Sequence, residues 1–151
     1  MRPSRDSCSL ALIDLLKTAT KFVTVGRKFT DWDQITAAQR PALFLWERGE
    51  TIAYQNEVGQ VVTMHDDAII CLDPSPEPTR DPISDIDALL DELDRVLAPT
   101  TGMDQAMGRQ TLGGLVYHCR IQGEIVKASG DVSNISLLIV PINVMIAQRT
   151  V

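Results

Sequence analysis

The chain has 151 residues, a mass of 16.6 kDa and a formal net charge of −6, which is enough for one domain with a hydrophobic core over residues 1–151. The acidic balance argues against a nucleic-acid-binding protein, which normally carries a basic surface. Three widely spaced cysteines, Cys8, Cys71 and Cys119, predict neither a disulfide framework nor a zinc site. The longest apolar run, Leu137 to Ile146, is too short to span a bilayer, so we expect a soluble intracellular protein without a membrane partner.

The first half of the chain predicts one helix and then extended segments. Asp6 or Ser7 can cap an amphipathic helix that runs to about Ala19. The extended segments are a short strand over 22–25, a strand over 42–47 that ends at the turn 48–50, and a segment over 61–73. Four prolines between residues 74 and 82 exclude regular structure in the linker that follows.

The second half predicts a helix, a loop and a hairpin. Asp81 is the expected cap of an amphipathic helix that starts at Pro82 and stops before Pro99. A glycine-containing loop over 100–114 follows. Alternation over 115–126, with Leu115, Tyr117, Cys119, Ile121 and Ile125 in the apolar row, predicts the first arm of a hairpin that turns near 129–131.

The second arm, 137–146, is apolar almost throughout, as in a strand covered on both faces, although Pro141 requires an edge position or a bulge. A small acidic protein does not usually cover both faces of a strand by itself, so we expect neighbouring copies to shelter part of this surface. The fold class predicted is α+β, an antiparallel sheet of about four strands with two helices packed on one face.

Candidate catalytic and metal-binding groups do not converge in the sequence. His118 and Cys119 are adjacent on a strand and point to opposite faces, and we expect His65, Asp66 and Asp67 on a solvated turn. The carboxylates of the second helix, Asp85, Asp87, Asp91, Glu92 and Asp94, fit a solvated polar face. We therefore predict no enzyme, no metal and no cofactor; a small hydrolase that uses residues 65–67 is the enzyme alternative.

Two segments are candidate protein–protein interfaces. The first joins the basic pair Arg27 and Lys28 to Phe29 and Trp32, since arginine and tryptophan are favoured at interface hot spots. The alternative is that the two aromatic side chains cover the edge of the core while Arg27 pairs with a nearby carboxylate. The second candidate is the loop that carries Met103, Met107 and Arg109, as a segment ordered by a partner or as a plain mobile loop.

The order of several segments resembles one protein family. The early helix, the 22–27 segment with Trp32 downstream, the strand beginning Pro41-Ala42-Leu43, the 89–97 helix and the hairpin that opens with Gln110-Thr111-Leu112-Gly113-Gly114 occur in the same order. Together they are similar to the tail-terminator (tail-completion, minor tail protein U-like) proteins of long-tailed bacteriophages and prophages.

This resemblance implies a structural virion protein, assembled in the host cytoplasm and placed at the head-proximal end of the tail. Its protomers would form a hexameric ring that caps the tail tube, stops its polymerisation and helps to join tail to head. The implied partners are other copies of the chain, the tail tube protein and a neck or head-completion protein. The alternatives are another phage neck or tail-tube-associated protein, a regulatory or adaptor module and, less favoured, a small enzyme.

Overall fold

The structure of the chain is a computed structural model that describes residues 2–27, 34–54, 59–73, 82–129 and 135–147. Its elements are α1 (Arg5–Leu16), β1 (Thr24–Gly26), the 3₁₀ turn η2 (Ala37–Gln39), β2 (Ala42–Tyr54), β3 (Gln60–Leu72), α2 (Pro82–Leu97), α3 (Gly102–Met107), β4 (His118–Ile121), β5 (Val126–Ser129) and β6 (Ser136–Ala147).

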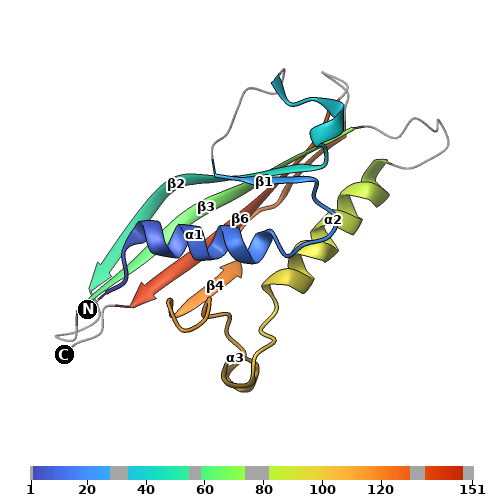
Figure 1. Cartoon of the computed structure of the whole chain (residues 1–151). Coiled ribbons are helices and arrows are strands. Elements are labelled where there is room, and N and C mark those ends of the chain that lie inside the picture. Colours follow the sequence, from blue (N-terminus) through green and yellow to red (C-terminus); the bar gives the residue numbers. More distant parts are fainter. Residues whose placement is uncertain (1, 28–33, 55–58, 74–81, 130–134, 148–151) are drawn as a thin grey trace.

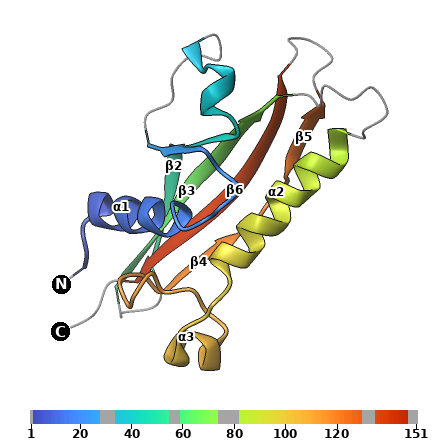
Figure 2. The same ribbon diagram turned by 45° about the vertical axis from the view of Figure 1, so that its right-hand side comes forward.

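A twisted sheet forms one layer, and α1 and α2 form a second layer on one of its faces (Figure 1). The strand order is β1-β2-β3-β6-β4, and β5 pairs with β6 further along the same edge. β1 runs parallel to β2, whereas the other pairs are antiparallel. The short α3 lies apart from this layer, near the loop that leads into β4 (Figure 2).

The predicted α+β class and the packing of both long helices on one face are therefore confirmed. The predicted sheet of about four antiparallel strands is wrong in detail, because the described residues form a mixed sheet of six strands with three α-helices. The parallel strand comes from the segment 22–27, where a shorter strand near the predicted position lies beside the start of β2.

The core lies between the helices and the sheet. The stripe Cys8, Leu12 and Leu16 of α1 is fully buried, and so are Ile86 and Leu93 of α2. Alternate residues of the two central strands complete it: Val62, Ala68 and Ile70 of β3 and Leu138, Val140, Ile142, Val144 and Ile146 of β6. Because side chains alternate along a strand, the intervening residues point to the opposite face of the sheet.

That opposite face is covered only in part. Near β1, Ile35 packs with Ala42, Phe44 and Cys71 in a second, smaller cluster. Further along β6, the residues of this face other than Pro141, such as Ile139, are only half-buried, although Leu138 and Val140 on the other face are fully buried. The single chain thus shelters one face of β6 completely and the other face incompletely.

β2 does not end where the sequence predicts. The expected turn at 48–50 is instead an irregularity between Glu47 and Gly49, after which β2 continues beside β3 to Tyr54. A bulge of this kind keeps the hydrogen-bonded ladder while it bends the strand. The hairpin of β2 and β3 is consequently much longer than predicted.

The first arm of the last hairpin is interrupted. β4 ends opposite Ile142 and β5 begins opposite Ile139, so the neighbouring strand is interrupted opposite Val140 and Pro141, and β6 itself pairs with β3 in unbroken register there. Gly123 lies in this break with φ of 124°, and a Cβ added there would lie 3.1 Å from Cγ of Pro141. A side chain larger than glycine's would therefore be both strained and crowded at this point.

Two helix predictions also change. α1 starts one residue before the expected cap Asp6, because the hydroxyl of Ser4 accepts the bond from the Ser7 amide. The segment 100–114 is not entirely loop, since α3 occupies its middle. α2 starts and ends as predicted, and its expected cap Asp81 lies outside the described residues. Within the described residues, no helix combines the length and hydrophobicity needed to cross a membrane.

Candidate functional site

The predicted interface residues fall into three groups in the structure. Lys28, Phe29 and Trp32 lie outside the described residues. Arg27 lies at the end of β1, beside α1. Met103, Met107 and Arg109 come together along one groove, about 850 Å³ in volume, at the end of the molecule that carries α3.

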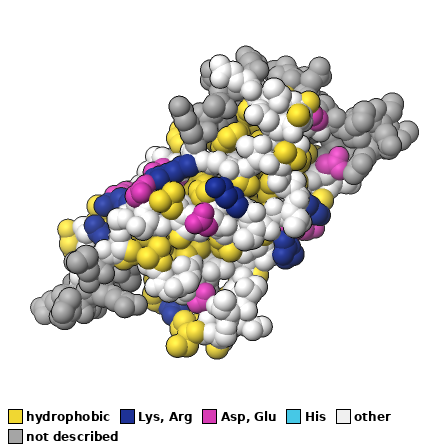
Figure 3. Space-filling view, viewed as in Figure 1, with side chains coloured by type: hydrophobic (Ala, Val, Ile, Leu, Met, Phe, Trp, Pro, Cys, Tyr) yellow, Lys and Arg dark blue, Asp and Glu magenta, His cyan; other side chains and the backbone are white. Residues whose placement is uncertain are grey.

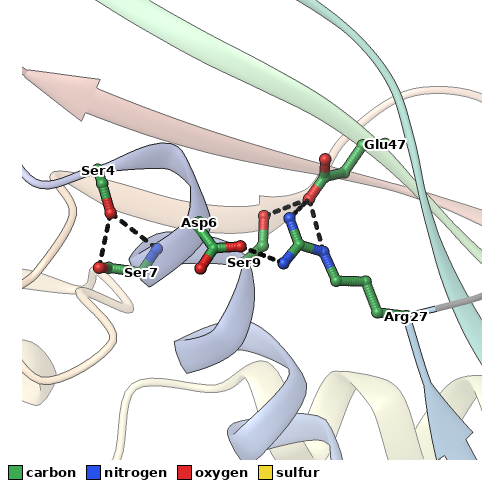
Figure 4. A network of polar contacts seen from close by, with 6 residues as sticks. All are labelled: Ser4, Asp6, Ser7, Ser9, Arg27 and Glu47. Carbon is green, nitrogen blue, oxygen red and sulfur yellow. Dashed lines mark hydrogen bonds and ion pairs between the residues drawn. The ribbon is translucent and has the colours of Figure 1, made fainter.

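Arg27 is held by carboxylates of its own chain (Figure 4). Its Nη2 and Nε donate to Oε1 of Glu47 at 2.6 and 3.1 Å, and its Nη1 donates to Asp6. Ser9 donates its hydroxyl to the same Glu47 oxygen at 2.6 Å. The alternative in which Arg27 pairs with a nearby carboxylate is therefore what the structure contains, and contact of Arg27 with a partner stays a prediction.

Asp66 lies in the buried face of β3, directly opposite Glu47 on β2. It is 1% exposed, and neither carboxyl oxygen has a hydrogen-bond partner within the described residues. Burial raises its pKa to about 7, with a further increase from the charges of Glu47 and Asp67 and an opposing effect of Arg27. The carboxyl group therefore stays mostly neutral at pH values where an exposed aspartate is ionised, because it lies among the apolar residues of the core.

The expected solvated turn at His65, Asp66 and Asp67 is therefore wrong, because these residues lie in the middle of β3. Adjacent residues of a strand face opposite sides, so Asp66 points into the core while His65 and Asp67 point to the open face. There His65 bridges Thr51 and Asn143, with contacts of 2.6 and 3.0 Å.

These groups cannot converge on one substrate across the thickness of a sheet. Asp67 is paired with Arg48 at 3.3 Å on the open face. Across the residues that the structure describes, no group of three His, Cys, Asp or Glu side chains is placed to hold a metal ion.

The acidic side chains of α2 were predicted to lie in solvent, and for Glu92 this prediction is wrong. Glu92 is 6% exposed; it accepts a bond from the Thr20 amide at 3.0 Å and pairs with Arg95 at 2.7 Å. The hydrogen bonds from Arg95, together with that from Thr20, lower its pKa to about 2. Asp87 pairs with Lys127 of β5 at 2.7 Å. Glu92 and Asp87 therefore tie α2 to other elements or to a neighbour on the same helix, a role that helix periodicity does not reveal.

The groove beside α3 is shaped by a left-handed turn. Thr111 donates its hydroxyl to Asp104 at 2.7 Å and its amide to the same carboxylate at 3.2 Å. The Thr111 hydroxyl in turn accepts the Gly114 amide at 2.9 Å. Leu112, Gly113 and Gly114 follow with φ of 52°, 75° and 86°. These bonds lower the pKa of Asp104, which remains charged and anchors α3 to the turn.

Gln110 fixes the same turn to the rest of the fold. Its side-chain oxygen accepts the Leu112 amide at 3.1 Å, and its carbonyl accepts the Cys119 amide of β4 at 2.8 Å. The Gln110–Gly114 sequence thus acts as a rigid connection between α3 and the sheet, and the position of Arg109 depends on it.

Arg109 lies across the groove over an aromatic ring. Its guanidinium carbon is 4.1 Å from the centre of the Tyr117 ring, which is a cation–π contact, and its Nη2 lies 2.9 Å from Sδ of Met107. Its Nε is buried without a hydrogen-bond partner in the described part of the chain. Tyr117 is 48% exposed, so its predicted place in the core row is wrong.

The groove also exposes apolar surface. Met103 is 75% exposed and Met107 is 44% exposed, and hydrophobic side chains are visible over the outer end of α3 (Figure 3). Arginine, methionine and aromatic side chains are the types enriched at protein interfaces. The sequence identified Arg109 and both methionines but missed Tyr117, for which only its large size and its position next to polar residues gave a signal.

A second exposed surface lies at the outer edge of β2. β1 pairs only with Ala42 to Phe44, so the edge from Leu45 to Tyr54 has no strand partner among the described residues. Trp46 is 54%, Ile52 48% and Tyr54 75% exposed along this stretch. The sequence did not indicate this edge, because β2 was expected to end at residue 47.

Comparison with known proteins adds no identification: no protein-family model matches the chain, and no curated protein is similar enough to count as a relative.

Proposed function

We propose that the chain is a structural virion protein: a tail terminator that forms a ring at the end of the tail tube, where it stops polymerisation and helps to join tail to head. The observation that carries this proposal is the outer edge of β2. An unpaired strand edge of this length, with exposed apolar side chains, is a surface that invites pairing with another chain.

A closed ring suits such a surface. Every copy in a cyclic assembly meets its neighbours through the same contacts, so edges are covered without open growth. The half-buried apolar residues on the open face of β6 add further surface for burial against a neighbour or the tube. Many assemblies pair subunits through strand edges. The resemblance of the segment order to that of tail terminators favours a phage tail among them.

The proposed function has two alternatives, another protein of the phage neck or tail and a small enzyme, and the first is favoured over the second. Another neck or tail-tube-associated protein would use the same edge and differ only in its place along the tail. A small enzyme is less favoured: Asp66 has the raised pKa of a general acid or base, but it faces the core, and it does not line the groove beside α3 or two smaller depressions found among the described residues.

Electron microscopy of particles that lack the protein tests the proposal directly. We expect overlong tubes or tails without heads, because nothing stops tube growth or presents a surface to the neck. Tails of normal length that carry heads would overturn the proposal.

A pair of substitutions tests the role of the β2 edge. Ile52→Lys together with Tyr54→Lys adds charge to the edge without touching the buried core, and we expect a folded protein that no longer limits tail length. Leu10→Lys is the matched control, since Leu10 on α1 is 48% exposed, the same fraction as Ile52. Tails of wild-type length with the double variant would show that this edge is not used.

A further inference from the structure

The groove beside α3 contains Arg109, a cation that forms no ion pair among the described residues, although the charged Asp104 lines the same groove and interacts with it electrostatically. Arg109 makes its contacts with a ring and a sulfur atom, and it forms no ion pair with any carboxylate in the described residues. Arg2 lines the same groove and makes a neutral hydrogen bond to Gln60 at 2.9 Å. The groove therefore offers two guanidinium groups next to the exposed methionines of α3, and a carboxylate is the group that satisfies them best.

The same chain presents carboxylates elsewhere. On α2, Asp87 and Glu92 are already paired with Lys127 and Arg95. Asp91 and Asp94 are exposed, and no ion pair joins them to a cation in the described part of the chain. They are three residues apart, so they lie on one side of the helix.

The two surfaces are different parts of the molecule, so a contact between them is head-to-tail. The groove lies by α3 at the lower end of the molecule, and α2 runs from the upper right down toward it in both views (Figures 1 and 2). A contact between two different surfaces of the same protein is the kind that generates rings. A contact between identical surfaces would instead close as a dimer.

We propose that the α3 groove of one copy binds the outer face of α2 of the next copy, with Arg109 paired to Asp91 and Asp94. This inference rests on the proposed ring and adds to it the surfaces through which neighbours meet. The methionine side chains of the groove form the apolar part of the contact. The charges set its orientation, because a copy docked the other way round would bring the acidic face of α2 against the same face of its neighbour.

Sedimentation of the full chain over a wide range of concentration tests this contact. We expect the wild-type chain to self-associate and Arg109→Glu to weaken the association by roughly thirtyfold or more, as for an interface hot spot. Arg109→Gln removes the charge alone and should weaken it less. Arg120→Glu is the matched control: it makes the same charge change at an exposed arginine of β4 whose Nε bonds Gln122.

Charge exchange makes the test specific. Arg109→Glu combined with Asp91→Arg and Asp94→Arg restores opposite charges across the same contact, so we expect association to return. Thermal unfolding of each variant shows that the monomer remains folded. A wild-type chain that stays monomeric at every concentration, an effect of Arg109→Glu no larger than that of Arg120→Glu, or no recovery in the triple variant would overturn the inference.

These outcomes are separate from those of the proposed function. Tail length in particles that lack the protein tests termination and does not depend on which surfaces join the copies. Normal termination by Arg109→Glu would reject the α3–α2 contact and leave the proposed function in place, whereas normal tails without the protein would reject the proposed function itself.

Discussion

Two arginines that look alike in the sequence have opposite surroundings in the fold. Arg27 bonds two carboxylates, Asp6 and Glu47, which belong to α1 and β2. Among the described residues, the Arg109 guanidinium contacts the ring of Tyr117 and the sulfur of Met107, and it forms no ion pair, although the charge of Asp104 lies near enough to interact with it. The first links elements of one chain, and the second has charge and hydrogen-bonding capacity left for another molecule.

The comparison of Arg27 with Arg109 shows what leaves a basic side chain able to bind another molecule. A guanidinium group that is already paired with carboxylates of its own chain gains little binding energy from a partner's carboxylate, because its charge is already balanced. One that lies on an aromatic ring and donates to a sulfur atom has no ion pair, so a carboxylate of another molecule can still add one. Availability thus depends on which distant residues the fold brings near, and a count of local charges does not reveal it.

The largest expected effect is the pH dependence of stability that comes from Asp66, the buried acid opposite Glu47. The pKa of Asp66 is raised to about 7 in the folded chain, above its ordinary value of 3.8, so the folded state binds a proton that the unfolded state has lost between these values. The contribution of Asp66 to stability is therefore greatest at acidic pH, falls as pH rises toward 7 and levels off above it. The slope contributed by this group is at most about 1.4 kcal/mol per pH unit.

Asp66→Asn should remove this slope, because asparagine does not ionise. The measurement is the free energy of unfolding by urea at pH 5 and pH 8 for both proteins. The difference between them isolates Asp66, since every other titrating group is shared. An equal fall in stability for wild type and variant would contradict the prediction.

The next effect concerns the anchor of the α3 groove. Asp104→Ala removes an acceptor of two bonds from Thr111, both in buried surroundings. Bonds to a charged group contribute more than neutral ones, so we expect the free energy of unfolding to fall by about 2 kcal/mol. The groove should lose its shape as well.

Denaturant unfolding measures the first consequence and sedimentation the second. Asp94→Ala is the control, because it removes an exposed aspartate that makes no ion pair in the described part of the chain. A fall in stability with Asp104→Ala no larger than with this control would show that α3 is held by something other than its aspartate.

Much of the fold is predictable from local pattern. The helix at 82–97 follows from an apolar stripe between two prolines, and the central strands follow from runs of branched apolar residues. Pro141 indicates an irregularity at this point of the last hairpin, and the structure has it as an interruption of the neighbouring strand. In each case the signal lies within a dozen residues of the structure it predicts.

The missed features depend on residues far apart in the sequence. The polar stretch after Glu47 looks like a turn, and it is the pairing with 60–66 that makes it a strand. Asp66 was expected in water because its neighbours are polar, yet the register of β3 turns it toward α1. The groove was identified only as a loop with Met103, Met107 and Arg109, since Tyr117 joins it through the Gln110–Gly114 turn.

The smallest effect separates the two arginines directly. Arg27→Ala breaks exposed ion pairs, and because its side chain is 36% exposed, solvent screening limits the loss to about 1 kcal/mol of unfolding free energy. Arg109→Ala removes no ion pair within the described residues, so we expect a loss below about 0.5 kcal/mol. In self-association the order should reverse, with Arg109→Ala the more damaging change. Equal effects of both substitutions on stability and on association would contradict this prediction. Arg27 would then not be a mainly intramolecular residue, nor Arg109 a mainly intermolecular one.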